Sequence, residues 1–172
     1  MDLKAQFFEL YQTHITRTGS EELLNFLETR SDFFIAPAST RFHLACEGGL
    51  LEHSINVAKQ MLQYQDEPLE SLVLCGLLHD VCKINYYKTS MRNVKNEETG
   101  QWEKQPFYQV EDSFPYGHGE KSVYLIERFV KLKVPEAMAI RWHMGGFDDS
   151  AKAGSFSINS SNNGLINLRI SG

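Results

Sequence analysis

A histidine and an aspartate stand side by side at His79-Asp80, with Lys83 three residues further along. The preceding segment, residues 69–78, is apolar enough to form a buried helix. Burying an ionisable pair without a partner is costly, and a metal ion is a suitable partner because imidazole and carboxylate are both ligands of divalent metals. The alternative is an ordinary helix cap held by hydrogen bonds, which we would favour for an isolated pair. The positions of the other histidines favour the metal.

Three further histidines, His53, His118 and His143, fall within, at the start of or at the end of separate predicted helices. Two or three histidines with a carboxylate suit a catalytic metal site that keeps positions open for water and substrate. The histidine-rich set favours Mn, Fe, Co, Ni or Zn over Mg alone. One ion or two are both compatible with it. No two histidines have the close spacing of a single-helix zinc site, so the spacing alone is weak evidence.

Helical periodicity dominates the chain outside one central segment. The predicted helices cover residues 2–17, 20–29, 49–62, 69–83, 117–130 and 135–143. Aromatic and β-branched residues alternate with polar ones further along, and Glu98-Thr99-Gly100 supplies a turn. This predicts a β-hairpin that pairs residues 88–96 with 101–110. The fold class we expect is therefore all-α, a compact helical bundle with a small inserted hairpin at about 88–110.

Composition and charge limit the class of protein. The chain has 172 residues, which suits one domain, and a net charge of -5, which argues against a dedicated non-specific nucleic-acid binder. No apolar run approaches the ~20 residues of a membrane helix, and the N-terminus has no signal-peptide pattern. We therefore expect a cytoplasmic protein with no membrane partner. Its oligomeric state is not specified by the sequence.

The three cysteines, Cys46, Cys75 and Cys82, have apolar neighbours and form no Cys-x-x-Cys pair. This indicates reduced thiols in the core. A nucleophilic Cys82 beside the His-Asp pair is the weaker alternative, since a cysteine on an apolar helix face more often serves packing.

Four ordered motifs carry a resemblance to a known family: Gly-Gly-Leu-Leu-Glu-His53, Leu-Leu-His79-Asp80-Val-Cys-Lys83, Gly-His118-Gly-Glu-Lys-Ser and Ile-Arg-Trp-His143. Together they resemble the HD superfamily of metal-dependent phosphohydrolases over about residues 41–148. The first motif is similar to the HD domain of bacterial and phage proteins related to a 3′–5′ exoribonuclease. The resemblance implies a compact helical domain that hydrolyses phosphorylated substrates.

The resemblance also implies site residues. A divalent metal would be held by His53, His79 and Asp80, with His118 and His143 serving a second metal or the substrate phosphate. We expect Asp80, Lys83 and His118 to act in catalysis. Lys83 would contact a phosphate, with a cation that stabilises a helix C-terminus as the alternative, and His118 would bind the second metal or pass a proton to the leaving oxygen. The substrate-binding candidates are Lys83, Arg41 and His43; a surface role is the alternative for the last two.

The expected function is cleavage of a phosphoester or phosphoanhydride in a small phosphorylated substrate such as a nucleotide. One alternative is a catalytically impaired module that binds metal or nucleotide, because the family's further aspartate has no counterpart: Asp148 and Asp149 come too early, and no acidic residue follows them. The second alternative is a 3′–5′ RNA exonuclease, which the acidic net charge disfavours.

The expected organisation is a single domain over residues 1–153. Its N-terminal helices occupy residues 1–40, and its motif-bearing core occupies residues 41–148. The Ser-, Asn- and Gly-rich tail, residues 154–172, is expected to be atypical or truncated.

Overall fold

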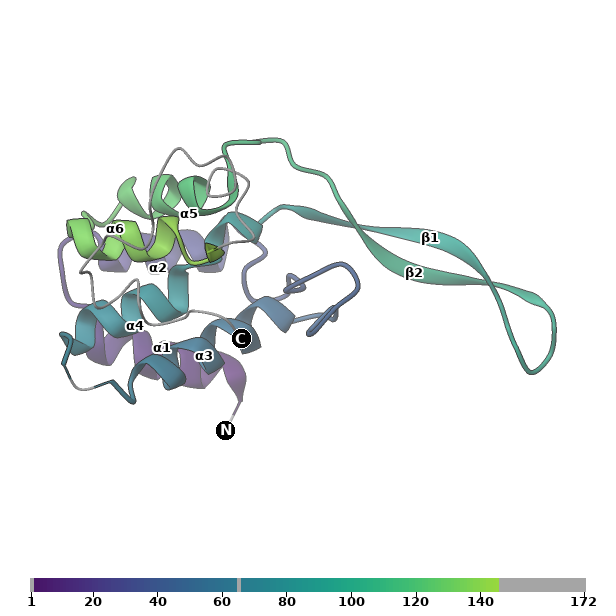
Figure 1. The fold of residues 1–172 in the computed structure, drawn as a ribbon, viewed down its shortest axis with the longest axis horizontal. Coiled ribbons are helices and arrows are strands. Elements are labelled where there is room, and N and C mark those ends of the chain that lie inside the picture. Colours follow the sequence, from purple (N-terminus) through teal and green to yellow (C-terminus); the bar gives the residue numbers. More distant parts are fainter. Residues whose placement is uncertain (1, 65, 146–172) are drawn as a thin grey trace.

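The computed structural model describes residues 2–64 and 66–145, and within them the chain is mostly helical, as predicted. The helices are α1 (Leu3–His14), α2 (Ser20–Thr29), α3 (Gly49–Met61), α4 (Leu69–Leu78), α5 (His118–Glu127) and α6 (Val134–Arg141), with a short 3-10 turn, η1 (Val81–Lys83). They form one body from which a single β-hairpin projects (Figure 1). The expectations for Asp148, Asp149 and the tail at 154–172 lie outside the described residues.

Helix α4 is the centre of the body. Every residue from Ser71 to Leu78 is buried, and α1, α3 and α6 all pack against this helix. A helix that is apolar all round is stable only when neighbours cover every side. None of the helices in the described part of the chain is long and apolar enough to cross a membrane.

The contact between α3 and α4 is unusually close at one point. A Cβ added at Gly76 would lie 2.5 Å from the Cα of Ala58, so only glycine fits there. The two helices also make the most extensive interhelical contact in the described structure. This contact brings the middle of α3 to the last turn of α4, where the ionisable pair begins.

Helix α4 ends earlier than the sequence predicts. We expected it to continue to Lys83, but it stops at Leu78, and the backbone leaves helical geometry at Asp80 before the 3-10 turn. The break falls where the chain reaches the polar groups of the other helices. Tertiary contacts to the Asp80 carboxylate therefore override the local helical preference.

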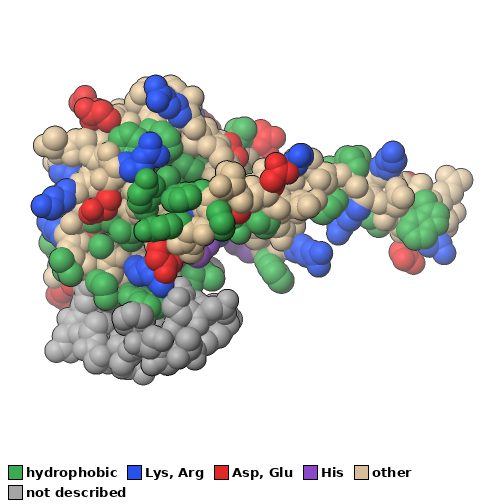
Figure 2. All heavy atoms as spheres, turned by 90° about the horizontal axis from the view of Figure 1, so that it is seen from above, with side chains coloured by type: hydrophobic (Ala, Val, Ile, Leu, Met, Phe, Trp, Pro, Cys, Tyr) green, Lys and Arg blue, Asp and Glu red, His purple; other side chains and the backbone are tan. Residues whose placement is uncertain are grey.

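The hairpin pairs β1 (Tyr87–Lys95) with β2 (Trp102–Val110) in antiparallel register, within one residue of the predicted boundaries. None of its residues is buried, and Met91 and Trp102 are strongly exposed. Lysine, arginine and hydrophobic side chains alternate along the projecting arm, and histidine side chains reach the surface where it leaves the body (Figure 2). The hairpin therefore adds nothing to the core.

The prediction of three core thiols is correct for Cys75 and Cys82 but wrong for Cys46, which is exposed. Cys46 lies in the loop before α3, and loops run over the surface because their backbone groups need solvent. Its apolar neighbours in sequence therefore do not indicate burial.

A buried ion pair joins the N-terminal helices to α6. Glu136 is fully buried, and the Arg17 guanidinium donates to both of its carboxylate oxygens at 2.8 and 2.9 Å. The Ser71 hydroxyl of α4 donates to the same carboxylate at 2.6 Å. Burial acts to raise the pKa of Glu136, but these hydrogen bonds outweigh it and hold the pKa below the ordinary value of 4.5.

We predict that Glu136→Gln lowers the free energy of unfolding at pH 7 by roughly 2 kcal/mol, because the partly buried Arg17 loses the buried one of its two carboxylate partners. The depressed pKa also makes wild-type stability fall as the pH drops below about 4.5, and the variant should show a shallower fall. Urea titrations between pH 3 and 7 measure both. Glu70→Gln is the matched control, since Glu70 contacts the same arginine from a more exposed position, and equal losses in the two variants would contradict the prediction.

Candidate metal centre

Four imidazoles converge on the buried carboxylate of Asp80. On one side, Asp80 Oδ2 lies 3.4 Å from His53 Nε2 and 3.5 Å from His79 Nε2. On the other side, Asp80 Oδ1 lies 2.9 Å from His118 Nε2 and 3.2 Å from His143 Nε2. The sequence predicts these five residues as a group, and the structure brings all of them together.

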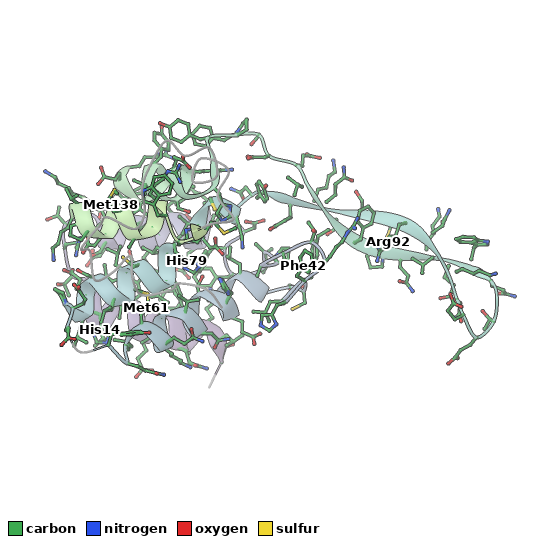
Figure 3. The ribbon with its side chains drawn as sticks, in the orientation of Figure 1. His14, Phe42, Met61, His79, Arg92 and Met138 are labelled. Carbon is green, nitrogen blue, oxygen red and sulfur yellow. The ribbon has the colours of Figure 1, made fainter. Side chains whose placement is uncertain are left out.

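Each histidine comes from a different element. His53 lies one turn into α3, and His79 caps α4 inside the body, on the side from which the hairpin leaves (Figure 3). His118 opens α5, and His143 follows the end of α6. Helices α5 and α6 touch closely at Gly119, where an added Cβ would collide with the Arg141 backbone. This contact sets His118 beside His143, with ring centroids 5.1 Å apart.

Backbone carbonyls orient two of the rings. His79 Nδ1 donates to the Gly76 carbonyl at 2.9 Å, and His143 Nδ1 donates to the Ile140 carbonyl at 2.7 Å. A carbonyl only accepts, so Nδ1 carries the proton and Nε2 faces Asp80 with a lone pair. These carbonyls cannot be predicted from the sequence, because backbone groups leave no trace in residue types.

The Nε2 atom of His143 is buried and makes no hydrogen bond, although it lies 3.2 Å from a carboxylate oxygen. A lone pair that faces an anion in a buried site is costly. A cation between the two atoms would remove that cost. This unpartnered nitrogen supports a metal at the site formed by His53, His79, Asp80, His118 and His143. We call this site the centre.

The protonation states suit metal ligation. Burial lowers the pKa of His79 to about 3, so its imidazole is neutral. Burial acts in the opposite direction on Asp80, but the positive charge of Lys83 and the hydrogen bond from His118 outweigh it and hold the pKa of the carboxyl well below its usual range. A neutral imidazole and a carboxylate anion are the forms that bind metal.

The distances also fit. Nitrogen and oxygen ligands at about 2.1 Å from one ion lie about 3.0 to 3.4 Å from each other at octahedral to tetrahedral angles. The His53 and His79 Nε2 atoms are 3.1 Å apart, and both lie within 3.5 Å of Asp80 Oδ2. His53, His79 and Asp80 therefore form a set that can hold one divalent ion.

The remaining candidates lie at different distances from the centre. Lys83 is inside it, with Nζ 2.7 Å from Asp80 Oδ2. Arg41 is exposed and lines a cavity between its own loop and the hairpin. His43 is exposed in the same loop and does not line that cavity. The structure therefore groups Lys83 with the histidines and places Arg41 and His43 outside the centre.

The structure changes the interpretation of two residues, one beside the centre and one in the lining of the cavity. The sulfur of Cys82 lies 3.5 Å from His118 Nδ1, although its position on an apolar segment favoured a packing role. From sequence, the hairpin cations Lys88, Arg92, Lys95 and Lys104 can either line a substrate mouth or occupy a solvated face, and the solvated face is favoured; the structure places Arg92 in the lining of the same cavity as Arg41. For Cys82 the sequence contained an indication of this proximity, because Cys82 stands only two positions after Asp80. No local signal distinguishes Arg92 from the other cations of the hairpin.

Comparison with known proteins agrees with this site. A family model described as HD domain matches residues 50–157, more than half of the chain, and the match includes His53, His79, Asp80, His118 and His143. The predicted resemblance to the HD superfamily is thereby confirmed, while the likeness to exoribonuclease-related members stays a prediction. No curated protein and no solved structure matches the chain significantly.

We predict that the purified protein retains a divalent transition metal and that a His79→Ala, Asp80→Ala double variant retains none, because the variant removes two of three converging ligands. Metal content after dialysis, measured by mass spectrometry, tests this. His14→Ala is the control: His14 ends α1 and contributes no atom to the centre. Equal metal content in the wild type and the double variant would place the metal elsewhere.

Proposed function

This chain belongs to the HD domain family, and we propose that it is a metal-dependent phosphohydrolase with its centre at Asp80. The observation that carries the proposal is that the two oxygens of the Asp80 carboxylate face different pairs of histidines. Its Oδ2 faces His53 and His79, and its Oδ1 faces His118 and His143. A carboxylate placed in this way is suited to bridge two ions, each with a pair of histidines.

Hydrolysis requires a water oxygen to bond to phosphorus while the bond to the leaving oxygen breaks and a proton reaches that oxygen. A divalent ion, when bound, lowers the pKa of water and polarises the phosphoryl oxygen. Lys83 adds a fixed positive charge at the centre that can contact a phosphoryl oxygen. His118 has the most exposed side chain of the four histidines, at 30%, so if only the ion at His53 and His79 is bound, His118 is the one best placed to pass a proton to the leaving oxygen.

A cavity of about 610 Å³ between residues 40–47 and the hairpin is a suitable place for the rest of the substrate. Arg41 and Arg92 line it together with Phe107 and Tyr108, and Glu47 adds one carboxylate. Within the described chain neither arginine is in an ion pair, and Arg92 stacks over the Phe107 ring at 5.6 Å. Two free guanidinium groups beside aromatic rings favour a phosphorylated ligand with a planar group, such as a nucleotide.

The walls of this cavity continue from the elements that carry the ligands. The loop at 40–47 leads directly into α3 and His53, and the hairpin follows η1 and Lys83. The Tyr87 hydroxyl donates to the Ala38 carbonyl at 3.4 Å and joins the two walls at their base. Figure 3 shows the loop of Phe42 beside the hairpin segment that carries Arg92. None of the residues of the centre lines the cavity, so the proposal requires a substrate that reaches from the cavity past the base of the hairpin to the centre.

We predict that the wild type with Mn²⁺ hydrolyses bis(p-nitrophenyl) phosphate and that Asp80→Asn lowers kcat by at least about 100-fold, because it removes the charge that holds the ions. Lys83→Met should lower kcat while metal content is unchanged. Lys88→Met is the control, since Lys88 pairs with exposed Glu111 on the hairpin. Metal retention without any turnover, across phosphodiesters and nucleotides, would instead support the metal- and nucleotide-binding module.

We predict that Arg92→Gln raises KM for a nucleotide substrate by about 10-fold with kcat little changed, because a charge-assisted contact remote from the reacting phosphorus is lost. Steady-state kinetics on whichever nucleotide is turned over would measure this. Lys104→Gln, on the same hairpin but not lining the cavity, should leave KM unchanged. Equal effects of the two substitutions would indicate a general electrostatic contribution and not a binding site.

A further inference from the structure

We propose that the Cys82 thiolate is a ligand on the Asp80 Oδ1 side of the centre, where it completes a mixed nitrogen, oxygen and sulfur site for a thiophilic divalent ion. The inference rests on the proposed metal centre, and it adds a ligand that the four histidines and the aspartate do not supply. The position would be shared by Asp80, Cys82 and His118, with His143 next to it.

The distances among these groups support ligation. One ligand atom each from Asp80, Cys82 and His118 lies within 4.8 Å of the others. His118 Nε2 is 2.9 Å from Asp80 Oδ1 and 3.6 Å from Cys82 Sγ. Zinc bonds of about 2.3 Å to sulfur and about 2.1 Å to nitrogen, at a tetrahedral angle, place the two ligand atoms about 3.6 Å apart. The separation of Sγ and Nε2 therefore suits coordination of one ion. The sulfur is equally close to Nδ1, at 3.5 Å, so ligation requires the His118 ring to turn until its Nε2 lone pair faces the shared position.

Two features fix the position of the sulfur: the packing of η1 against α5 and a backbone hydrogen bond of Cys82. Cys82 is in η1, which packs against α5, the helix that begins with His118. The backbone N–H of Cys82 donates to the Ser122 hydroxyl of α5 at 3.1 Å, and Ser122 is fully buried. The thiol is thus tied to the same helix as its neighbouring imidazole. Its side chain is almost fully buried, so solvent does not compete for it.

Ligation has a clear chemical consequence. The thiol loses its proton to solvent as the bond between sulfur and metal forms. Thiolate is a soft ligand that favours Zn²⁺, Co²⁺ or Fe²⁺, whereas Mg²⁺ and Mn²⁺ prefer oxygen. We therefore expect the chain to select the first three ions at this position. The ordinary alternative is a packed thiol that only contacts the His118 ring.

Absorption spectroscopy of the Co²⁺-loaded protein tests the proposal. The wild type should show a near-ultraviolet charge-transfer band from thiolate to Co²⁺ together with the visible bands of bound Co²⁺. Cys82→Ser should lose the near-ultraviolet band, keep visible bands and bind Co²⁺ at least about 10-fold more weakly. Cys46→Ser is the control, because Cys46 is exposed in the loop before α3, and it should retain the full spectrum.

Different results would overturn different parts. Visible bands without a charge-transfer band in the wild type, or a band that persists in Cys82→Ser, would reject Cys82 as a ligand and leave the proposed function intact. No Co²⁺ binding by the wild type would reject the metal centre and the ligand together. X-ray absorption on the Zn²⁺-loaded wild type needs no variant and should show a sulfur at about 2.3 Å. A first coordination shell made of nitrogen and oxygen alone would exclude Cys82 as a ligand.

Discussion

A buried negative charge at Asp80 is the constraint around which the described structure is arranged. A carboxylate without solvent is stable only if opposite charges or hydrogen-bond donors surround it. Here the Lys83 ammonium and the His118 imidazole donate to the carboxylate, whereas His79 and His143 face it with lone pairs that a bound cation would compensate, and no single element could carry all of these groups. The groups arrive from several helices at one point, so satisfying this one side chain constrains how the helices that carry these groups meet.

Two glycines make this convergence possible. Gly76 lets α4 approach α3 at Ala58, which sets His79 beside His53. Gly119 lets α5 approach the end of α6, which sets His118 beside the residues that follow Arg141. Any side chain at either position would push a pair of helices apart. Because ligand atoms must meet within a few tenths of an ångström, such a shift would separate one histidine pair from the carboxylate before it unfolded the bundle.

The parts of the site that could be predicted are those with a local signal. Helical periodicity, the turn at Gly100 and the ordered histidine motifs are all read along the chain, and the structure agrees with them. The end of α4 at Leu78, the pairing of Arg17 with Glu136 and the exposure of Cys46 depend on contacts between residues distant in sequence. Periodicity carries no information about such contacts. Arg92 could not be singled out among the hairpin cations for the same reason, since the loop that faces it lies about fifty residues earlier.

The hairpin and the centre are structurally independent, and this separation bears on specificity. The centre is built on α4, whose residues from Ser71 onward are buried and held on all sides. The hairpin contributes no buried residue, so changes in its side chains cost the core nothing. Yet β1 begins only four residues after Lys83, so changes at the base of the hairpin lie close to the centre, whereas its tip projects away from the body (Figure 1). A rigid centre that carries a freely variable arm can keep its chemistry while the arm changes which phosphorylated molecule it accepts.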